Sequence, residues 1–275
     1  MALVIQTNVA SLQAQKNLSS AQGSLQTSFN RLSSGNRINS AKDDAAGLAI
    51  SENMRNQVRS YTVAERNAND AVSMAQTAEG ALGEVSNILG RMRELAVQGS
   101  NGSLQTADRA YLKTEFTQMQ AEVKRILTST KFNGRQLIKK SSESIAFQVG
   151  INNTTDDRIS VSFGGVNLDA LTSTANSVSG DSSGSKKALG TIDDALSTVS
   201  TARARFGAAM NRFEITTSNI QTARLNVAAS ASRIKDVDVA EETAALSKNQ
   251  VLTQAATSVL SQANSSPQSA LMLIR

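Results

Sequence analysis

Several residue types that supply chemistry or interrupt helices are absent or scarce in this chain. Its 275 residues include no cysteine, histidine or tryptophan, one proline, and 3% aromatic residues. Without cysteine and histidine the chain cannot form a Ser/His or Cys/His nucleophilic site, a zinc site of the usual ligands or a disulfide framework. Pro267 lies close to the C-terminus, so proline interrupts no helix earlier in the chain. These absences favour long helices in thin bundles and remove the catalytic groups of most enzyme classes.

Long apolar runs and a targeting pattern are also missing. No run approaches the roughly 20 apolar residues that cross a bilayer, so we expect no membrane insertion. Residues 1–5 form an apolar patch without the basic region or the sustained apolar core of a cleavable secretory signal. Any export would therefore use another route.

The net charge of +5 comes from scattered basic residues. They occur singly or in short pairs such as Lys124-Arg125 and Lys139-Lys140, without interleaved aromatic residues. Nucleic-acid interfaces concentrate both kinds of residue, so we expect no nucleic-acid partner.

Paired acidic residues are the remaining candidates for metal or acid–base chemistry. They are Asp43-Asp44, Asp156-Asp157 and Glu241-Glu242. The first pair suits a helix N-terminus, where carboxylates meet exposed N–H groups, and the second lies in a turn-rich stretch. No clustered partner completes a site, so we predict structural roles, no catalytic residue, no metal and no cofactor.

What the sequence does contain is a seven-residue apolar repeat between residues 189 and 234. Such a series lies along one face of a long helix that packs against a partner, and ~1.5 Å per residue gives a helix of roughly 65 to 70 Å. The second seam position is interrupted by Arg203, Thr217 and Arg224, which suits a bundle better than an isolated coiled coil. The repeat consists of Ile192, Val199, Phe206, Phe213, Ile220, Val227 and Ile234.

A second repeat, between residues 54 and 96, predicts the partner helix. Both seam positions are apolar there, and the middle of the repeat is small, so two helices can approach closely at that level. The first seam is Met54, Tyr61, Ala68, Ala75, Leu82, Leu89 and Ala96.

The two ends of the chain share an unusual scarcity of charge. Residues 1–32 have the pattern of an amphipathic helix in which Lys16 is the only charge before Arg31, and residues 249–274 carry no charge at all. Exposed helices normally need charges for solubility, so both ends must contact protein on more than one side. Neither has enough apolar area to hold a helix firmly, and we expect both to be disordered in the monomer and to fold on association.

Shorter segments connect these helices. Ser40 and Asp43 form a capping box that should start the helix after the connector, and the turn at 99–102 should send a shorter helix back antiparallel. Alternation of apolar residues over 145–149 and 159–163 predicts a β-hairpin near 144–163. The Ser/Gly-rich residues 172–187 have no periodicity and predict a flexible surface loop.

Long motifs in this sequence resemble the bacterial flagellin family. They are MALVIQTNVASLQAQKNL, SFNRLSSGNRINSAKDDAAGLAIS, RMRELAVQGSN, KFNG and SQANSSPQSALMLIR, and they occur in order up to about Gly134 and again from about Leu189. The short middle corresponds to a form almost without the large outer domains that flagellins often carry.

The resemblance and the helical pattern together predict a mainly α fold. It is an elongated antiparallel helical bundle or coiled-coil rod with a small β-hairpin region and paired N- and C-terminal helices. Residues 1–43 with 235–275 would form an inner coiled-coil domain, and residues 44–234 would form a rod domain with three long helices and the hairpin.

The resemblance implies a structural subunit that polymerises into the flagellar filament for motility, without enzymatic activity. It also implies type III export without signal cleavage, a cytosolic chaperone for the C-terminal segment, and contacts with filament cap and hook-junction proteins. We predict that polymerisation contacts involve Leu18, Leu25, Leu32, Leu246, Leu252, Val259 and Leu260.

The resemblance further implies recognition of the monomer by the flagellin-sensing Toll-like receptor of vertebrates. Arg91 and Glu115 would supply charge-assisted hydrogen bonds, Leu95, taken as a surface residue, would be the apolar anchor, and Gln98 would lie at the rim. Gly90 departs from the Gln common in that patch.

Other functions remain open from the sequence. A hook–filament junction protein would share the terminal helices, and a soluble coiled-coil scaffold would form a stable dimer with folded ends. A hydrolase is the enzyme alternative, although residues 164–187 are short and contain neither His nor Cys.

Overall fold

The computed structural model describes residues 7–173, 178 and 182–273 and divides into two compact units. Unit 1 combines Met1–Val58 with Leu225–Arg275, and unit 2 is Arg59–Arg224. Two helices pass from one unit to the other, α2 (Ala45–Gly99) and α5 (Ser182–Lys235).

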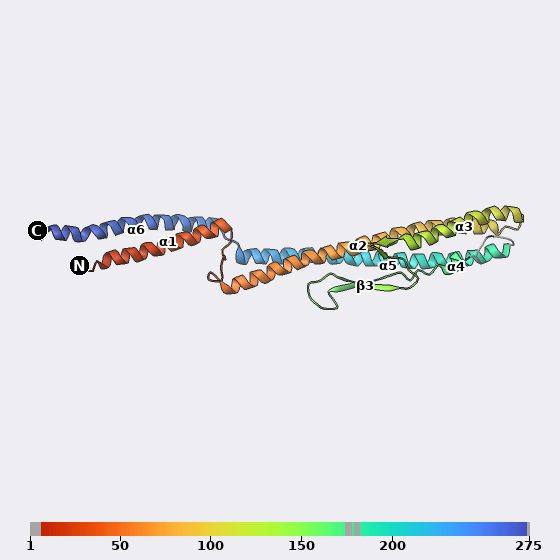
Figure 1. Ribbon diagram of the computed structural model, residues 1–275, viewed down its shortest axis with the longest axis horizontal. Helices are drawn as coiled ribbons and strands as arrows, with labels where there is room; N and C mark the ends of the chain where they lie inside the picture. The colour runs from red at the N-terminus through yellow and green to blue at the C-terminus, as the bar shows by residue number, and fades with distance from the viewer. Residues whose placement is uncertain (1–6, 174–177, 179–181, 274–275) are drawn as a thin grey trace. The chain divides into compact units, whose positions relative to one another are not determined.

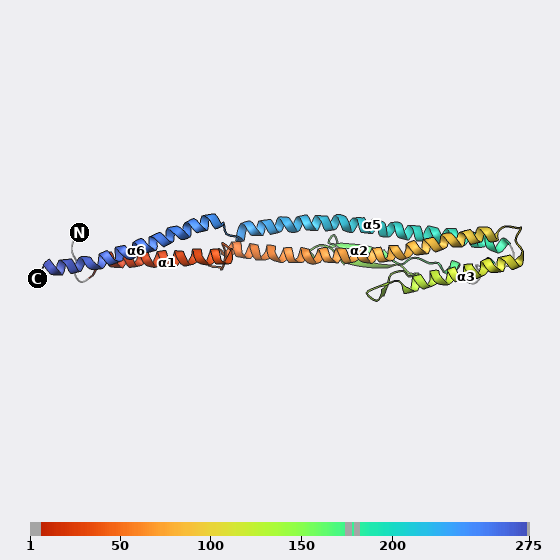
Figure 2. The same ribbon diagram turned by 90° about the horizontal axis from the view of Figure 1, so that it is seen from above.

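Unit 1 is built around an antiparallel pair of helices, α1 (Val9–Ser34) and α6 (Val239–Leu273), which lie side by side in Figures 1 and 2. The side chain of Asn8 caps α1 by accepting a hydrogen bond from Ser11 N at 3.0 Å. Gly35 ends the helix in the left-handed conformation, at φ 70°. Residues 1–6 of the predicted first helix and residues 274–275 of the tail lie outside the described residues.

The connectors beside these helices pair with each other. Arg37 N donates to Lys235 O at 2.6 Å, and Val237 N donates to Gly35 O at 3.1 Å. These two backbone bonds join the C-terminal end of α1 to the start of α6, so they set the antiparallel register of the terminal pair.

The predicted capping box at the start of α2 is wrong in its position. Ser40 and Asp43 do bond to each other, but they form a turn, and the helix starts at Ala45. Asp44 accepts from Gly47 N at 2.8 Å and therefore caps the helix. The Ser40 hydroxyl, with the Ser40 backbone N–H, lowers the pKa of Asp43 below its usual value.

Unit 2 consists of most of α2 and α5, the shorter α3 (Thr106–Ser129), and two small antiparallel sheets (Figure 2). One sheet pairs β1 (Lys131–Phe132) with β2 (Arg135–Gln136) around Asn133 and Gly134, whose φ values are 48° and 77°. Positive φ at both central residues defines a type I′ hairpin turn. The other sheet pairs β3 (Glu143–Gln148) with β4 (Arg158–Phe163), which confirms the predicted hairpin.

The core of unit 2 follows both predicted repeats. From Ala68 to Ala96 every residue of the α2 seam is fully buried, and on α5 Ile192, Val199, Phe206 and Phe213 are at most 1% exposed. The buried alanines of α2 leave room for the large rings of α5, and Phe147 and Phe163 of the hairpin contact Phe213 and Phe206 with ring centroids 5.5 and 5.3 Å apart. The hairpin is thus anchored to α5 by aromatic contacts.

The two arginines among the polar interruptions of the α5 seam pair with acids of α2. Arg203 bonds to Glu79 at 2.7 Å and Arg224 to Glu65 at 2.6 Å. Because both pairs join antiparallel helices, they also fix the register of α2 against α5.

Both ends of the predicted loop at 172–187 are helical in the structure. The short helix α4 (Asp169–Thr172) precedes it, and α5 already begins at Ser182. Residues 174–177 and 179–181 lie outside the described residues. Ala188 and Ser185 are fully buried, so the N-terminal turns of α5 are held by packing despite their Ser/Gly composition.

Candidate interaction surfaces

The terminal helix pair is the first candidate surface. Asn8 Nδ2 donates to Ala263 O at 2.8 Å, Ser11 Oγ donates to Asn264 Oδ1 at 2.7 Å, and Arg31 lies 3.6 Å from Glu242 at the other end. The contacts between α1 and α6 are therefore polar at both ends. Ala14 is the buried apolar residue of α1, so the pair has a thin core.

The predicted polymerisation residues occupy two different environments in this pair. Leu18, Leu25, Leu32, Leu246 and Leu260 are half-buried, at the spacing of the faces through which α1 and α6 pack. Leu252 and Val259 are exposed, at 46% and 58%. The first group stabilises the pair, and the second faces away from it.

Other exposed apolar residues of the terminal helices were missed as site residues. They are Val9, Leu12, Phe29, Val239 and Val251, each at least 57% exposed. Apart from Val239, these residues could have been predicted from the sequence, because they are apolar, lie outside the seven-residue repeat that packs α1 against α6, and have few charged neighbours. Exposed apolar side chains on two paired helices are typical of an interaction surface.

The second candidate surface lies where α3 returns beside α2. Arg91 bonds to Glu115 on α3 at 2.9 Å and to Glu94 one turn along α2 at 2.9 Å. The hydrogen bonds that Arg91 donates to Glu94 and then to Glu115 raise the pKa of Arg91. Arg91 and Glu115 are both accessible, with side chains 51% and 38% exposed, and Gln98 is also exposed.

The prediction that Leu95 is a surface residue is wrong. Its exposed fraction is 1%, and it belongs to the main core cluster of unit 2. The cause is the third helix: α2 is covered by α5 on one side and by α3 on another, so its buried sector is wider than a two-helix seam. Val97, which the sequence did not single out, is the exposed apolar residue of this stretch, at 51%.

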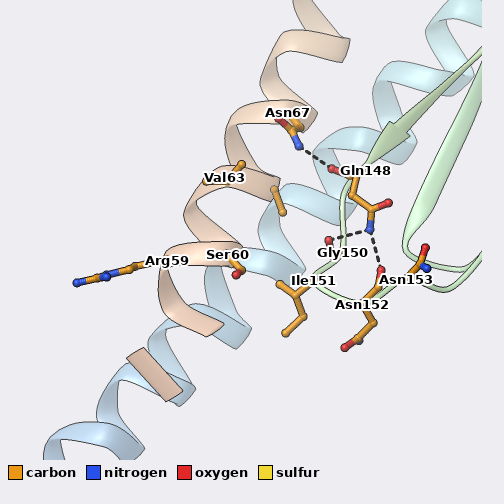
Figure 3. A pocket seen from close by; sticks show the side chains of 10 residues that line it. Arg59, Ser60, Val63, Asn67, Gln148, Gly150, Ile151, Asn152 and Asn153 are labelled. Carbon is orange, nitrogen blue, oxygen red and sulfur yellow. Dashed lines mark hydrogen bonds between the residues drawn. The ribbon is translucent and has the colours of Figure 1, made fainter. Parts of the chain in front are cut away.

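A groove beside the hairpin loop is the third candidate surface (Figure 3). It has a volume of about 490 Å³ and lies between α2 and residues 148–153. Asn67 Nδ2 donates to Gln148 O at 3.0 Å, and Gln148 Nε2 donates to Gly150 O and Asn152 O at 3.1 and 2.9 Å, so amide groups hold the loop in place. Val63 and Ile151 supply apolar surface between them. No sequence pattern indicated this groove.

The described residues contain neither a cluster of metal ligands nor a membrane-spanning helix. Among the described side chains, no three His, Cys, Asp or Glu residues are grouped as a metal site would require. In the described part of the chain, no helix has the length and apolar character needed to cross a membrane.

Comparisons with known proteins agree across nearly the whole chain. The family profile described as the bacterial flagellin N-terminal helical region matches residues 5–143, and that of the C-terminal helical region matches residues 189–274. A flagellin of Halalkalibacterium halodurans is 42% identical over 274 residues, covering 99% of this chain and 100% of the relative. The flagellar filament 33 kDa core protein of Treponema phagedenis is 37% identical, with 99% and 100% coverage.

Solved structures are similar as well. The crystal structure of Bacillus cereus flagellin is 29% identical, covers 60% of this chain and 94% of that one, and superposes with a TM-score of 0.50. A structure described as a putative flagellar hook-associated protein from Vibrio parahaemolyticus covers 70% of this chain and 100% of that one, at 18% identity and a TM-score of 0.59. At that identity the second likeness shows the fold alone.

Proposed function

This chain belongs to the bacterial flagellin family and is a structural subunit of the flagellar filament, and from that premise we propose that copies polymerise mainly through its terminal helices. In this proposal residues 1–43 and 235–275 form an inner coiled-coil domain, and residues 44–234 form the surrounding rod domain. The observation that carries it is the exposed apolar face of α1 and α6, since a soluble subunit leaves such a face open only for a partner.

The half-buried and the exposed residues among those predicted would then have different roles. Leu18, Leu25, Leu32, Leu246 and Leu260 hold α1 against α6, and Leu252 and Val259 contact neighbouring copies. The thin core and the absence of charge over residues 249–274 support terminal helices that are disordered in the free subunit and fold on assembly.

The experiment compares the full chain with substitutions on the exposed face. Val251→Asn with Val259→Asn should abolish elongation of filament seeds, because both side chains are more than half exposed and contribute little to the subunit itself. The matched control is Ser258→Asn, an exposed change on the same helix, which should elongate normally. Elongation of the double variant at the wild-type rate would refute the assignment.

Removal of the last 30 residues or so provides a second test. The truncated chain should remain soluble and largely helical, because the core of unit 2 is untouched, but should form no filament. Filaments of the truncated chain would show that the tail is not required. Long homopolymers in electron micrographs of the full chain would also distinguish a filament subunit from a junction protein used in few copies.

The remaining partners follow from the family and belong to the same proposal. The subunit would be exported by the type III apparatus without signal cleavage, bound by a cytosolic chaperone, and placed among cap and junction proteins. No catalytic role is proposed.

Recognition by the vertebrate Toll-like receptor is a second proposal, and the accessible Arg91–Glu115 pair supports it. Arg91, Glu115 and Gln98 would contact the receptor, while buried Leu95 would hold Arg91 in place from beneath. Arg91→Ala should weaken binding by on the order of 1 to 3 kcal/mol, as loss of a central contact does. Unchanged affinity in a surface-plasmon titration, with helicity intact, would contradict this.

A further inference from the structure

Exposed apolar side chains of unit 2 gather at two places. Val63 and Ile215, at 50% and 64% exposure, lie against opposite sides of the hairpin loop at 149–157, where each lines a hollow. Val97 and Tyr111, at 51% and 78%, lie near the turn between α2 and α3. Among the described residues of unit 2, these are the large apolar side chains that remain exposed.

The two places are far apart and differ in shape. Because Glu115 contacts Arg91, Tyr111 lies near the level of residue 95, and the stretch of α2 from Val63 to there is about 50 Å long at 1.5 Å per residue. The first place is a groove, and the second carries a projecting ring. A single contact cannot cover both places, but two neighbouring copies could, one at each place. A contact between two different patches of the same chain is the kind that produces an open helical polymer.

The two places also differ in the charged residue that lies beside each of them. Arg59 is one turn before Val63 and extends away from the hairpin loop at the edge of the groove (Figure 3). In the part of the chain that the structure describes, it makes no ion pair. Asp108 is one turn before Tyr111 and accepts a hydrogen bond from Gln105 N at 3.2 Å, but has no cationic partner among the described residues. Asp108 thus caps the start of α3, and among the described residues neither Arg59 nor Asp108 has an ion-pair partner, although their charges are opposite in sign.

We propose that Tyr111 of one copy seats in the groove beside Val63 of the next copy, with Asp108 of the first opposite Arg59 of the second. This proposal rests on the filament function, and it names a contact outside the terminal helices. The ring of tyrosine suits the apolar surface of Val63 and Ile151, and its hydroxyl suits the amides of Asn67 and Asn152 that line the groove. A second copy is the occupant because the chain is a filament subunit and carries both halves of the contact.

The experiment measures seeded elongation of the full chain. Arg59→Asp and Asp108→Arg should each slow elongation at least tenfold, and one chain with both substitutions should recover most of the wild-type rate, because the charge pair is restored in reverse. The matched control is Arg66→Asp, an exposed reversal on the same helix outside the groove, which should elongate as the wild type. Circular dichroism checks that each variant keeps its helices.

Tyrosine 111 supplies an independent readout. Tyr111→Ala should slow elongation at least tenfold, whereas Tyr111→Phe, which keeps the ring, should lose much less. The proposal is overturned if Tyr111→Ala elongates as the wild type, or if the double reversal is no faster than the slower single one. Failure of the wild type to extend seeds would instead refute the filament function, so the two failures are distinguishable.

Discussion

Leu95→Ala separates a core role from a binding role at the α2–α3 surface. The side chain is 1% exposed and belongs to the main core cluster, so its truncation removes buried methyl groups and leaves a cavity between packed helices. Such changes cost about 2 to 5 kcal/mol, the higher values applying where the surroundings cannot collapse. Because α2 is packed by α5 and α3 together, little collapse is available, and we expect about 3 kcal/mol.

The assay is chemical denaturation monitored by circular dichroism, with thermal unfolding beside it. A loss of about 3 kcal/mol corresponds to a Tm lower by about 6 to 12 °C for a unit of this size. The matched control is Val97→Ala, two residues away and 51% exposed, which should change the free energy of unfolding by less than about 0.5 kcal/mol. Equal, small effects of both substitutions would refute the assignment of Leu95 to the core.

Three further predictions concern contacts within unit 2. Phe213→Ala removes a fully buried ring and should destabilise the subunit by about 3 to 5 kcal/mol in denaturant titrations, with amide exchange of the hairpin rising most. Arg224→Ala leaves Glu65 with one fewer partner, and because both side chains are partly exposed, the loss should be about 1 kcal/mol by the same assay. Hydrogen bonds from Lys139 and then Arg135 lower the pKa of Glu143. The stability that the Glu143 carboxylate contributes is therefore present above the usual carboxyl pKa and is lost as the pH falls through the lowered pKa. Lys139→Gln should raise the pKa of Glu143 in an NMR titration.

The seven-residue repeats made the long helices predictable because one physical rule governs them. The seam residues between Ala68 and Ala96 and between Ile192 and Phe213 are buried as a shared seam requires, and no proline or tight turn interrupts these helices. The hairpin was predictable for a similar reason, since Ile145 opposite Val161 and Phe147 opposite Ile159 keep the same face inward. In each case the period of the pattern identifies the element.

Boundaries and single contacts were less predictable. The Ser40–Asp43 pattern predicted an earlier start for α2, but the helix is capped by Asp44. The prediction was wrong because the same motif can instead form a turn closed by hydrogen bonds between Ser40 and Asp43. The small hairpin at 131–136 was missed, although Asn133-Gly134 is its usual turn sequence, since strands of two residues show no alternation. Buried Arg109, which donates to Gly99 O and Asn101 O at 3.1 and 2.9 Å, has no sequence signal at all.

The candidate sites show why burial could not be read from one repeat alone. A helix that packs against one partner buries a narrow stripe. Leu95 lies on the edge of the stripe that α2 presents to α5, so packing against α5 alone would predict that it is exposed. Once α3 covers the neighbouring face, the stripe widens, Leu95 becomes core, and Val97 becomes the exposed apolar residue. Among the described residues of the terminal pair, α1 packs against α6 with a narrow buried stripe, and Leu252 and Val259 remain exposed. The same rule that buries Leu95 therefore leaves Leu252 and Val259 exposed in the terminal pair.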